Sequence, residues 1–259
     1  MENKSTAKRL LKAPFRALGL DVVRWPPPKS QPEVSPEELK VIERFGPHYK
    51  PEEHWIARCG IKTVLDVGAH MGEFARRIRE ILPNAALVCF EPLQEPYAKL
   101  VQRFEGQPNF RSIRCALGEQ AAQSEFHHNE FTQSSSMLPM AELHKEAFPF
   151  TVNEKKEIIE VRTLSEATRD LNLQDPLLLK LDVQGFEDKV IAGGEEIVAR
   201  AKIIIVEVSF QNLYEGGPLF DDIYRILKAR GFTYHGNFDQ LNSPKDGRVL
   251  QADAVFCNS

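Results

Sequence analysis

Short apolar runs rich in β-branched residues alternate with helical segments from residue 61 onward, and this alternation constrains the fold more than any other feature. Such an order builds a mostly parallel sheet covered by helices. In sheets of this kind the ligand lies outside the carboxyl ends of the strands. The expected strands are residues 63–67, 86–91, 110–116, 177–182 and 203–208, followed by 233–238 and 251–257 as a closing antiparallel pair.

The chain of 259 residues is at the upper end of what one hydrophobic core holds, so we expect one domain with a short appendage. Prolines between positions 26 and 36 favour extended chain, and the segment SPEEL at 35–39 has the features of a helix start. We therefore predict a basic appendage with a proline-rich linker over residues 1–34 and a catalytic domain over 35–259. A polar insertion at about 119–157 is predicted to be a lid or substrate loop.

The composition of the chain limits the kinds of partner that it can bind. A net charge of −4 supplies no overall field for binding nucleic acid, and no apolar run approaches the ~20 residues of a membrane span. We predict a cytoplasmic protein with no nucleic-acid partner. Two interpretations stay open for residues 1–20, which carry five basic side chains among leucines: a helix in weak peripheral contact with a membrane, or a tail or packing helix, which Pro14 favours.

The first expected strand ends in the sequence DVGAHMGEF, which runs directly into a helix. Gly68 and Gly72 allow a tight turn and the approach of a ligand to the backbone, although a tight connection alone would explain them. Glu91 ends the second strand nineteen residues after Gly72, the spacing at which an acid reaches the hydroxyls of a ribose. Asp66 would repel a pyrophosphate but suits a cationic ligand, which favours S-adenosylmethionine over a nicotinamide dinucleotide.

Two further acids end the fourth and fifth strands. Asp182 and Glu207 are expected to meet at adjacent strand ends, where they could orient a hydroxyl or hold a divalent cation. We predict them as the catalytic residues and predict no metal ligands. The alternative is that Asp182 and Glu187 cap a helix and that Glu207 is structural. His144 and His235 are weaker candidates. In the insertion, His127, His128 and Ser134 to Ser136 suit hydrogen bonding to a polyhydroxylated acceptor, and a solvated polar loop is the alternative.

Together these motifs resemble the FkbM-type S-adenosylmethionine-dependent methyltransferases. The similar segments lie in the same order over roughly residues 60–257. They are LDVGAHMGEF, FEP, ALG, QSSSMLP, VRTL, LKLDVQGFE, VIAGG, VEVSF with LYEG, and QADAVF. The sequence departs from the family at His70, where asparagine is common, and at Gln184, where glutamate is frequent.

The resemblance implies an α/β fold of the Rossmann-like class I methyltransferase type, with a seven-stranded, mostly parallel sheet, the last strand antiparallel and helices on both faces. It implies S-adenosyl-L-methionine as the cofactor and O-methylation of a hydroxyl on a sugar, glycolipid or natural product. The implied cofactor contacts are Asp66, Gly68, His70 and Gly72 for the methionine part, Glu91 with Pro92 for the ribose, and Ala116 with Leu117 for the adenine. Asp182 would lie nearest the methyl group. The competing readings are a nicotinamide-dependent oxidoreductase and a non-catalytic nucleoside-binding module.

Overall fold

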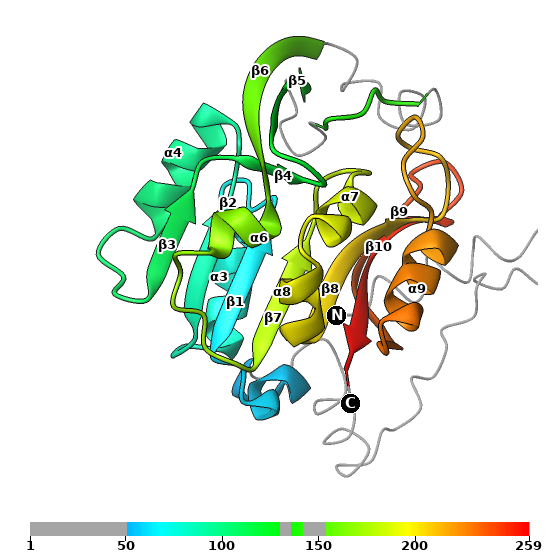
Figure 1. The fold of residues 1–259 in the computed structure, drawn as a ribbon. Coiled ribbons are helices and arrows are strands. Elements are labelled where there is room, and N and C mark those ends of the chain that lie inside the picture. Colours follow the sequence, from blue (N-terminus) through cyan, green and yellow to red (C-terminus); the bar gives the residue numbers. More distant parts are fainter. Residues whose placement is uncertain (1–50, 130–135, 142–153, 259) are drawn as a thin grey trace, which may run out of the picture. The chain divides into compact units, whose positions relative to one another are not determined.

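The computed structural model describes residues 51–129, 136–141 and 154–258 (Figure 1). All of them belong to one compact unit, Lys50–Ser259. The predicted appendage at 1–34, the predicted helix start at 35–39, His144, Ser134 and Ser135 lie outside the described residues. The domain boundary at residue 35 therefore stays a prediction.

A seven-stranded sheet in the order β3-β2-β1-β7-β8-β10-β9 forms the centre of the unit. All neighbouring strands up to β8 are parallel, and β10 runs antiparallel to both β8 and β9. The strands are β1 Thr63–Val67, β2 Ala86–Phe90, β3 Phe110–Ile113, β7 Leu177–Leu181, β8 Ala201–Ser209, β9 Thr233–Asn242 and β10 Val249–Cys257. The predicted fold class is confirmed, including the closing antiparallel pair.

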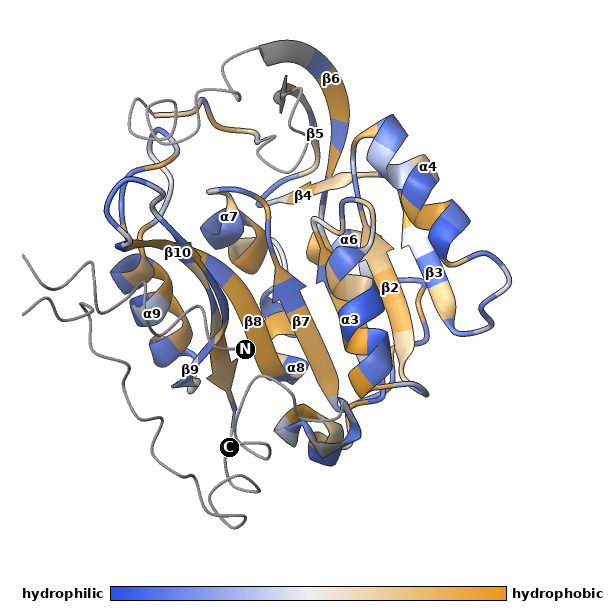
Figure 2. Cartoon of the chain, turned by 180° about the vertical axis from the view of Figure 1, so that it is seen from behind, coloured by the Kyte–Doolittle hydropathy of each residue, from blue (hydrophilic) through white to orange (hydrophobic). Residues whose placement is uncertain are grey.

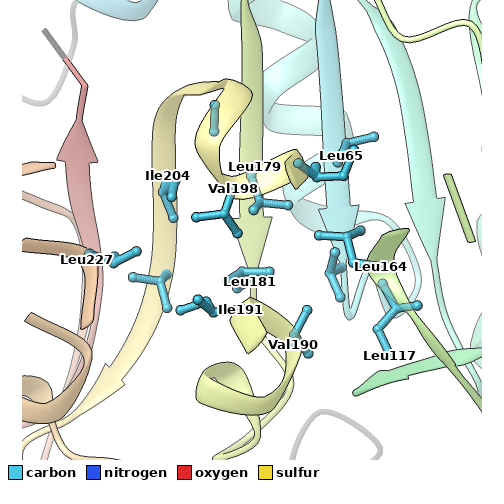
Figure 3. Packing of buried hydrophobic residues seen from close by; sticks show 14 of the residues in the cluster. Leu65, Leu117, Leu164, Leu179, Leu181, Val190, Ile191, Val198, Ile204 and Leu227 are labelled. Carbon is cyan, nitrogen blue, oxygen red and sulfur yellow. The ribbon is translucent and has the colours of Figure 1, made fainter. Parts of the chain in front are cut away.

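Helices cover both faces of this sheet because its central strands are apolar on both sides (Figure 2). One face packs against α6 Leu164–Thr168, α7 Glu187–Ala192, α8 Glu195–Arg200 and α9 Phe220–Ala229. In Figure 3, Leu179 and Leu181 of β7 lie against Val198 of α8 and Ile191 of α7. The other face packs against α3 Glu73–Ile81, α4 Gln94–Arg103 and the 3₁₀ helix η2 Trp55–Cys59, which follows η1 Pro51–Glu53.

The predicted strand over 110–116 is two strands, and this is a correction. After β3 the chain leaves the main sheet and forms β4 Ala116–Gly118, which joins β5 Ala122–Asn129 and β6 Glu154–Thr163 in a second sheet of order β4-β6-β5. The insertion expected as a loop is therefore strand at both ends. Ile159 and Val161 of β6 are buried while Ile158 and Glu160 are exposed, the alternation of a strand with one covered face. In Figure 1 this small sheet lies beyond the carboxyl ends of β1 and β2.

A short described part of the insertion, residues 136–141, is fixed to the loop after β8. The backbone N–H of Ala141 donates to Leu213 O at 2.9 Å, and that of Glu215 donates to Pro139 O at 2.9 Å. Met140 and Tyr214 form an isolated antiparallel bridge between these two bonds. The insertion is thus connected to the main domain at the edge where the parallel strands end.

Candidate active site

A cavity of about 480 Å³ opens at the carboxyl ends of β1, β2, β7 and β8, where the sequence places the chemistry. The small sheet and the β9–β10 hairpin contribute to its walls. Of the predicted site residues, the following line it: Asp66, Gly68, His70, Glu91, Pro92, Ala116, Leu117, Asp182 and Glu207. Open space at this edge is what a cofactor and an acceptor would require.

Glu91 is held by two backbone N–H groups, one on each carboxylate oxygen. Its Oε2 accepts the backbone N–H of His70 at 2.9 Å, and its Oε1 accepts the N–H of Leu93 at 2.9 Å. The side chain is only 5% exposed, and burial raises its pKa to about 7. Each carboxylate oxygen can accept a second hydrogen bond, so Glu91 can receive the two hydroxyls of a ribose while the backbone holds it in place.

Gly68 turns with a φ of +80°, and its backbone N–H donates to Phe90 O at 3.0 Å. A Cβ at this position would lie 1.8 Å from the carbonyl oxygen of Asp182. The glycine is therefore required by the close approach of the turns after β1 and β7, and it brings Asp182 beside Asp66. Burial raises the pKa of the Asp66 carboxyl to about 7, against the opposing charge of Lys180.

Gly72 does not line the cavity, although the sequence places it in the cofactor turn. A Cβ there would lie 2.8 Å from Leu100 and 2.9 Å from Phe104, so the residue permits α3 and α4 to approach each other. His70 has a φ of +49° and reaches the cavity, and its Nδ1 lies 3.4 Å from Glu73 Oε2. Burial lowers the pKa of the His70 imidazole.

Apolar side chains line the part of the cavity next to Glu91. Ala116 and Leu117 of β4 lie there with Leu93, and Phe126 and Met137 of the insertion complete the wall. The flat faces of a base such as adenine can pack against an apolar wall of this kind. The apolar wall and the carboxylates of Glu91 and Asp66 together fit a cofactor that contains a nucleoside and carries a positive charge.

Asp182 and Glu207 lie together, as the sequence predicts. The amide Nε2 of Gln184 donates to Asp182 Oδ1 at 2.7 Å and to Glu207 Oε2 at 2.8 Å. Glu207 also accepts from Gln251 Nε2 at 2.8 Å. Burial and the neighbouring Asp182 charge raise the pKa of Glu207 well above its ordinary value.

Lys180 is a functional candidate that the sequence analysis did not single out. It lies within β7 with a side chain only 2% exposed, and its Nζ bonds Asp253 Oδ1 at 2.8 Å and Asp182 Oδ2 at 3.1 Å. Both acids favour the charged ammonium and raise the pKa of Lys180 despite its burial. Asp182 thus has a fixed donor on each oxygen. No cluster of three or more metal-ligating side chains occurs among the described residues.

Glu187 and His235, two other residues considered in the sequence, lie away from the reacting groups. Glu187 does not line the cavity; its carboxylate accepts the backbone N–H groups of Val183 and Gly185 and so closes the turn after β7. His235 is exposed and stacks on Trp55 at 6.5 Å between ring centroids. The side chains of His127 and His128 are not among those described, although both residues lie in β5.

A central parallel sheet closed by an antiparallel last strand, with a carboxylate after β2 facing an open cavity, defines a Rossmann-like class I methyltransferase domain. A family model for the methyltransferase FkbM domain matches residues 66–234. Because the match covers more than half of the chain, the chain belongs to the FkbM methyltransferase family. Its cofactor is S-adenosyl-L-methionine, and its domain is an S-adenosylmethionine-dependent methyltransferase domain.

Individual relatives are distant. The chain is 29% identical to the 2-O-methyltransferase NoeI of Sinorhizobium fredii over 161 residues, which are 60% of this chain and 66% of that protein, just under two thirds. Among solved structures, TehB of Haemophilus influenzae has a TM-score of 0.42 at 10% identity, covering 79% of this chain and 60% of that chain. A TehB-like S-adenosylmethionine-dependent methyltransferase of Corynebacterium glutamicum has a TM-score of 0.39 at 13% identity, covering 86% and 95%.

Within the described residues, no helix combines the length and apolar character needed to cross a membrane.

Proposed function

We propose that this chain transfers the methyl group of S-adenosylmethionine to a hydroxyl of a sugar, glycolipid or similar polyhydroxylated acceptor. The observation that carries the proposal is the convergence of Asp182 and Glu207 on one amide, at the wall of a cavity whose other part carries the ribose-binding acid Glu91. The 2-O-methyltransferase NoeI, a distant relative, supports oxygen as the acceptor atom.

The cavity divides into a cofactor part and an acceptor part. Glu91 and the apolar wall formed by β4 and the insertion make up the first. Gln251 of β10 and Gln240 of β9 line the second, beside Asp182 and Glu207. Amide and carboxylate groups at this end can donate to and accept from the hydroxyls of a polyol, whereas acids there would repel a phosphate or carboxylate close to the reacting atom.

The chemistry requires a hydroxyl oxygen aligned with the methyl carbon and a group that takes the hydroxyl proton. S-adenosylmethionine, when bound, supplies an electrophilic methyl group on a sulfonium. Asp182 would accept a hydrogen bond from the acceptor hydroxyl and take its proton as the oxygen–methyl bond forms and the methyl–sulfur bond breaks, with S-adenosylhomocysteine as the leaving group. Glu207 would support Asp182 through Gln184. Alignment and proton removal together account for several kcal/mol of barrier lowering, of which a positioned base contributes about 10²- to 10⁴-fold in rate.

Calorimetry with S-adenosylhomocysteine tests the cofactor part, and methyl incorporation from labelled S-adenosylmethionine tests the acceptor part. We expect one-to-one binding, and methyl transfer to members of a panel of monosaccharides, methyl glycosides and glycolipids. Asp182→Asn should lower turnover about 10²-fold or more with unchanged affinity for S-adenosylhomocysteine. Full turnover in that variant would contradict the role of Asp182.

The competing readings give different results in the same experiments. Membership of the FkbM methyltransferase family counts against a nicotinamide-dependent oxidoreductase, which would bind the reduced dinucleotide and would not bind S-adenosylhomocysteine. A non-catalytic binding module would bind S-adenosylhomocysteine but transfer no methyl group to any acceptor. The peripheral membrane contact predicted for residues 1–20 stays a prediction, and sedimentation with anionic vesicles, with and without residues 1–30, tests it.

A further inference from the structure

Gln184 occupies a backbone conformation that side-chain-bearing residues adopt rarely. Its φ is +57°, and the next residue, Gly185, has a φ of +94°. The surrounding groups hold this turn from two sides. The hydroxyl of Ser136, buried to 1% exposure, donates to Gln184 O at 2.6 Å, and Glu187 accepts the N–H of Gly185 at 3.1 Å. Unusual backbone geometry of this kind persists where the structure around it fixes it, and it is concentrated at functional sites.

The side-chain amide of Gln184 has one possible orientation. Its Nε2 carries two N–H groups, and both are used, on Asp182 Oδ1 and on Glu207 Oε2. Its Oε1 accepts the hydroxyl of Tyr214. Turning the amide by 180° would direct its carbonyl oxygen at two carboxylates and its NH₂ group at a hydroxyl, so the network fixes the assignment.

Tyr214 is itself held firmly. A Cβ added to Gly185 would lie 2.9 Å from the Tyr214 Cβ, and the backbone of Tyr214 is bridged to Met140 of the insertion. Burial and the charge of Glu207 raise the pKa of the Tyr214 phenol well above its ordinary value, so the phenol keeps its proton. The donor that orients the amide is therefore present throughout the working pH range.

We propose that Gln184 is a positioning residue, which holds Asp182 and Glu207 in the arrangement that the acceptor hydroxyl meets, and that Tyr214 fixes which end of its amide faces them. This inference rests on the proposed function, because it assigns Gln184 a role in orienting the base of that reaction. Lys180 fixes the other oxygen of Asp182, so the carboxylate is held at both ends without a further cation. The bond from Ser136 to the Gln184 carbonyl connects this arrangement to the insertion.

Four variants test this role. Gln184→Leu removes the amide at similar volume. Gln184→Glu keeps the shape but replaces the NH₂ group with an oxygen, which places a third carboxyl group beside Asp182 and Glu207. Tyr214→Phe removes only the hydroxyl that orients the amide. Gln102→Leu, at an exposed position of α4, is the matched control.

The first readout needs no acceptor: the titration of Glu207 followed by NMR on protein with ¹³C-labelled glutamate carboxyls, with S-adenosylhomocysteine bound. Other charged or titratable groups face the pair from every side: Lys180, Asp66, Asp253, Glu187 and Tyr214. A hydrogen bond to a carboxylate favours its charged form, so losing the amide should raise the Glu207 midpoint by about one pH unit in Gln184→Leu. We expect an equal or larger rise in Gln184→Glu, a smaller rise in Tyr214→Phe and no change in the control.

The second readout is turnover with methyl glycosides of common hexoses and deoxyhexoses as probe acceptors. We expect kcat to fall about 10²-fold in Gln184→Leu and about 10-fold in Tyr214→Phe. The KM for S-adenosylmethionine and the affinity for S-adenosylhomocysteine should stay within about 3-fold of the original chain, because Gln184 lies on the acceptor side.

The inference is overturned if Glu207 titrates in Gln184→Leu as in the original chain, or if that variant loses cofactor affinity as steeply as turnover. Should Gln184→Leu not fold, an unchanged Glu207 midpoint in Tyr214→Phe overturns it equally. Failure of the proposed function has a different signature: the original chain would then transfer no methyl group to any hydroxyl acceptor, while the Glu207 titration with S-adenosylhomocysteine bound still reports on Gln184.

Discussion

Replacing Lys180 with methionine should destabilise the domain strongly. The substitution keeps the length and volume of the buried stem but removes the ammonium that bonds Asp182 at 3.1 Å and Asp253 at 2.8 Å. Removing one partner of a buried ion pair typically costs 3–5 kcal/mol, because the remaining charge is left without compensation. The side chains of the two acids are 32% and 21% exposed, so water compensates them in part, and we expect a loss of about 3 kcal/mol, the lower end of that range.

Urea unfolding followed by circular dichroism measures this loss. With a slope of about 2–3 kcal/mol per molar urea, a 3 kcal/mol loss lowers the midpoint by about 1 M or slightly more. Lys189→Met is the matched control: its ammonium lies 3.3 Å from Asp188 on the surface, with the side chain 45% exposed, and such pairs contribute under about 1 kcal/mol.

One further measurement separates the ion pairs from a simple packing effect. Adding Asp253→Asn to Lys180→Met should recover about 1 kcal/mol or more, since one unpaired acid is removed. A loss below about 1 kcal/mol in Lys180→Met, or no recovery in the double variant, would refute the reasoning.

Three other outcomes follow from the geometry. Glu91→Gln should weaken S-adenosylhomocysteine binding about 10- to 100-fold in calorimetry above the Glu91 pKa of about 7, where the carboxyl is charged and a bond to it is worth about 1.5–3 kcal/mol, and an affinity within 3-fold of the original would contradict the ribose contact. Burial raises the pKa of Asp66, Glu91 and Glu187 to about 7, so the native state keeps protons that the unfolded chain releases, and the free energy of unfolding should fall as the pH rises from about 4.5 to 7. A urea midpoint that rises over that window would count against this assignment of protons. Gly193→Ala places a Cβ 2.0 Å from the last carbonyl oxygen of β4 and should cost about 2 kcal/mol or more, whereas Gly106→Ala, at a φ of +74° with nothing within 4 Å, should cost about 1 kcal/mol; equal thermal shifts would contradict the close contact.

The sequence predicts the central strands well because their burial leaves little choice of residue. Thr63–Val67 is buried at every position and Leu177–Leu181 likewise, so each appears as a short, mostly apolar run that only Asp66 or Lys180 interrupts. The expected end of the second strand at residue 91 differs from the observed end at Phe90 by one position, which is the usual uncertainty of a strand boundary. The strand ends in turn place Glu91, Asp182 and Glu207 at one edge.

The second sheet is harder to predict because its strands are covered on one side only. In β6, charged residues surround the alternating pair Ile159 and Val161, and the stretch has the composition of a polar loop. Its partner β4 has three residues and belongs to a different sheet from β3, although only Arg114 and Cys115 separate the two strands. Whether the chain stays in one sheet or passes to another depends on which elements pack against each side of it. Those contacts come from distant parts of the chain, so the local sequence does not show them.

Gly72 shows how a motif can be recognised for the wrong physical reason. The spacing of the glycines indicates a ligand-binding turn, and the turn does border the cavity at Gly68 and His70. Gly72 lies four residues after Gly68. A side chain at this position would collide with the side chains of Leu100 and Phe104 at the next helix, and this collision is the reason for the glycine. Glycine appears where a Cβ would collide, and the sequence alone does not tell a collision with a ligand from one with a neighbouring helix.

Lys180 could have been inferred from the rules that predict its strand. A lysine in the middle of LLLKL interrupts a run that must be buried on both faces, and a buried ammonium is tolerated only with partners. The partners must come from residues near the same level of the sheet: Asp182, directly after the end of β7, and Asp253 of β10, which pairs with Glu207 of β8. A charge inside an otherwise apolar central strand therefore predicts an acidic cluster at that strand's end, and here the cluster is the one that the acceptor hydroxyl would meet.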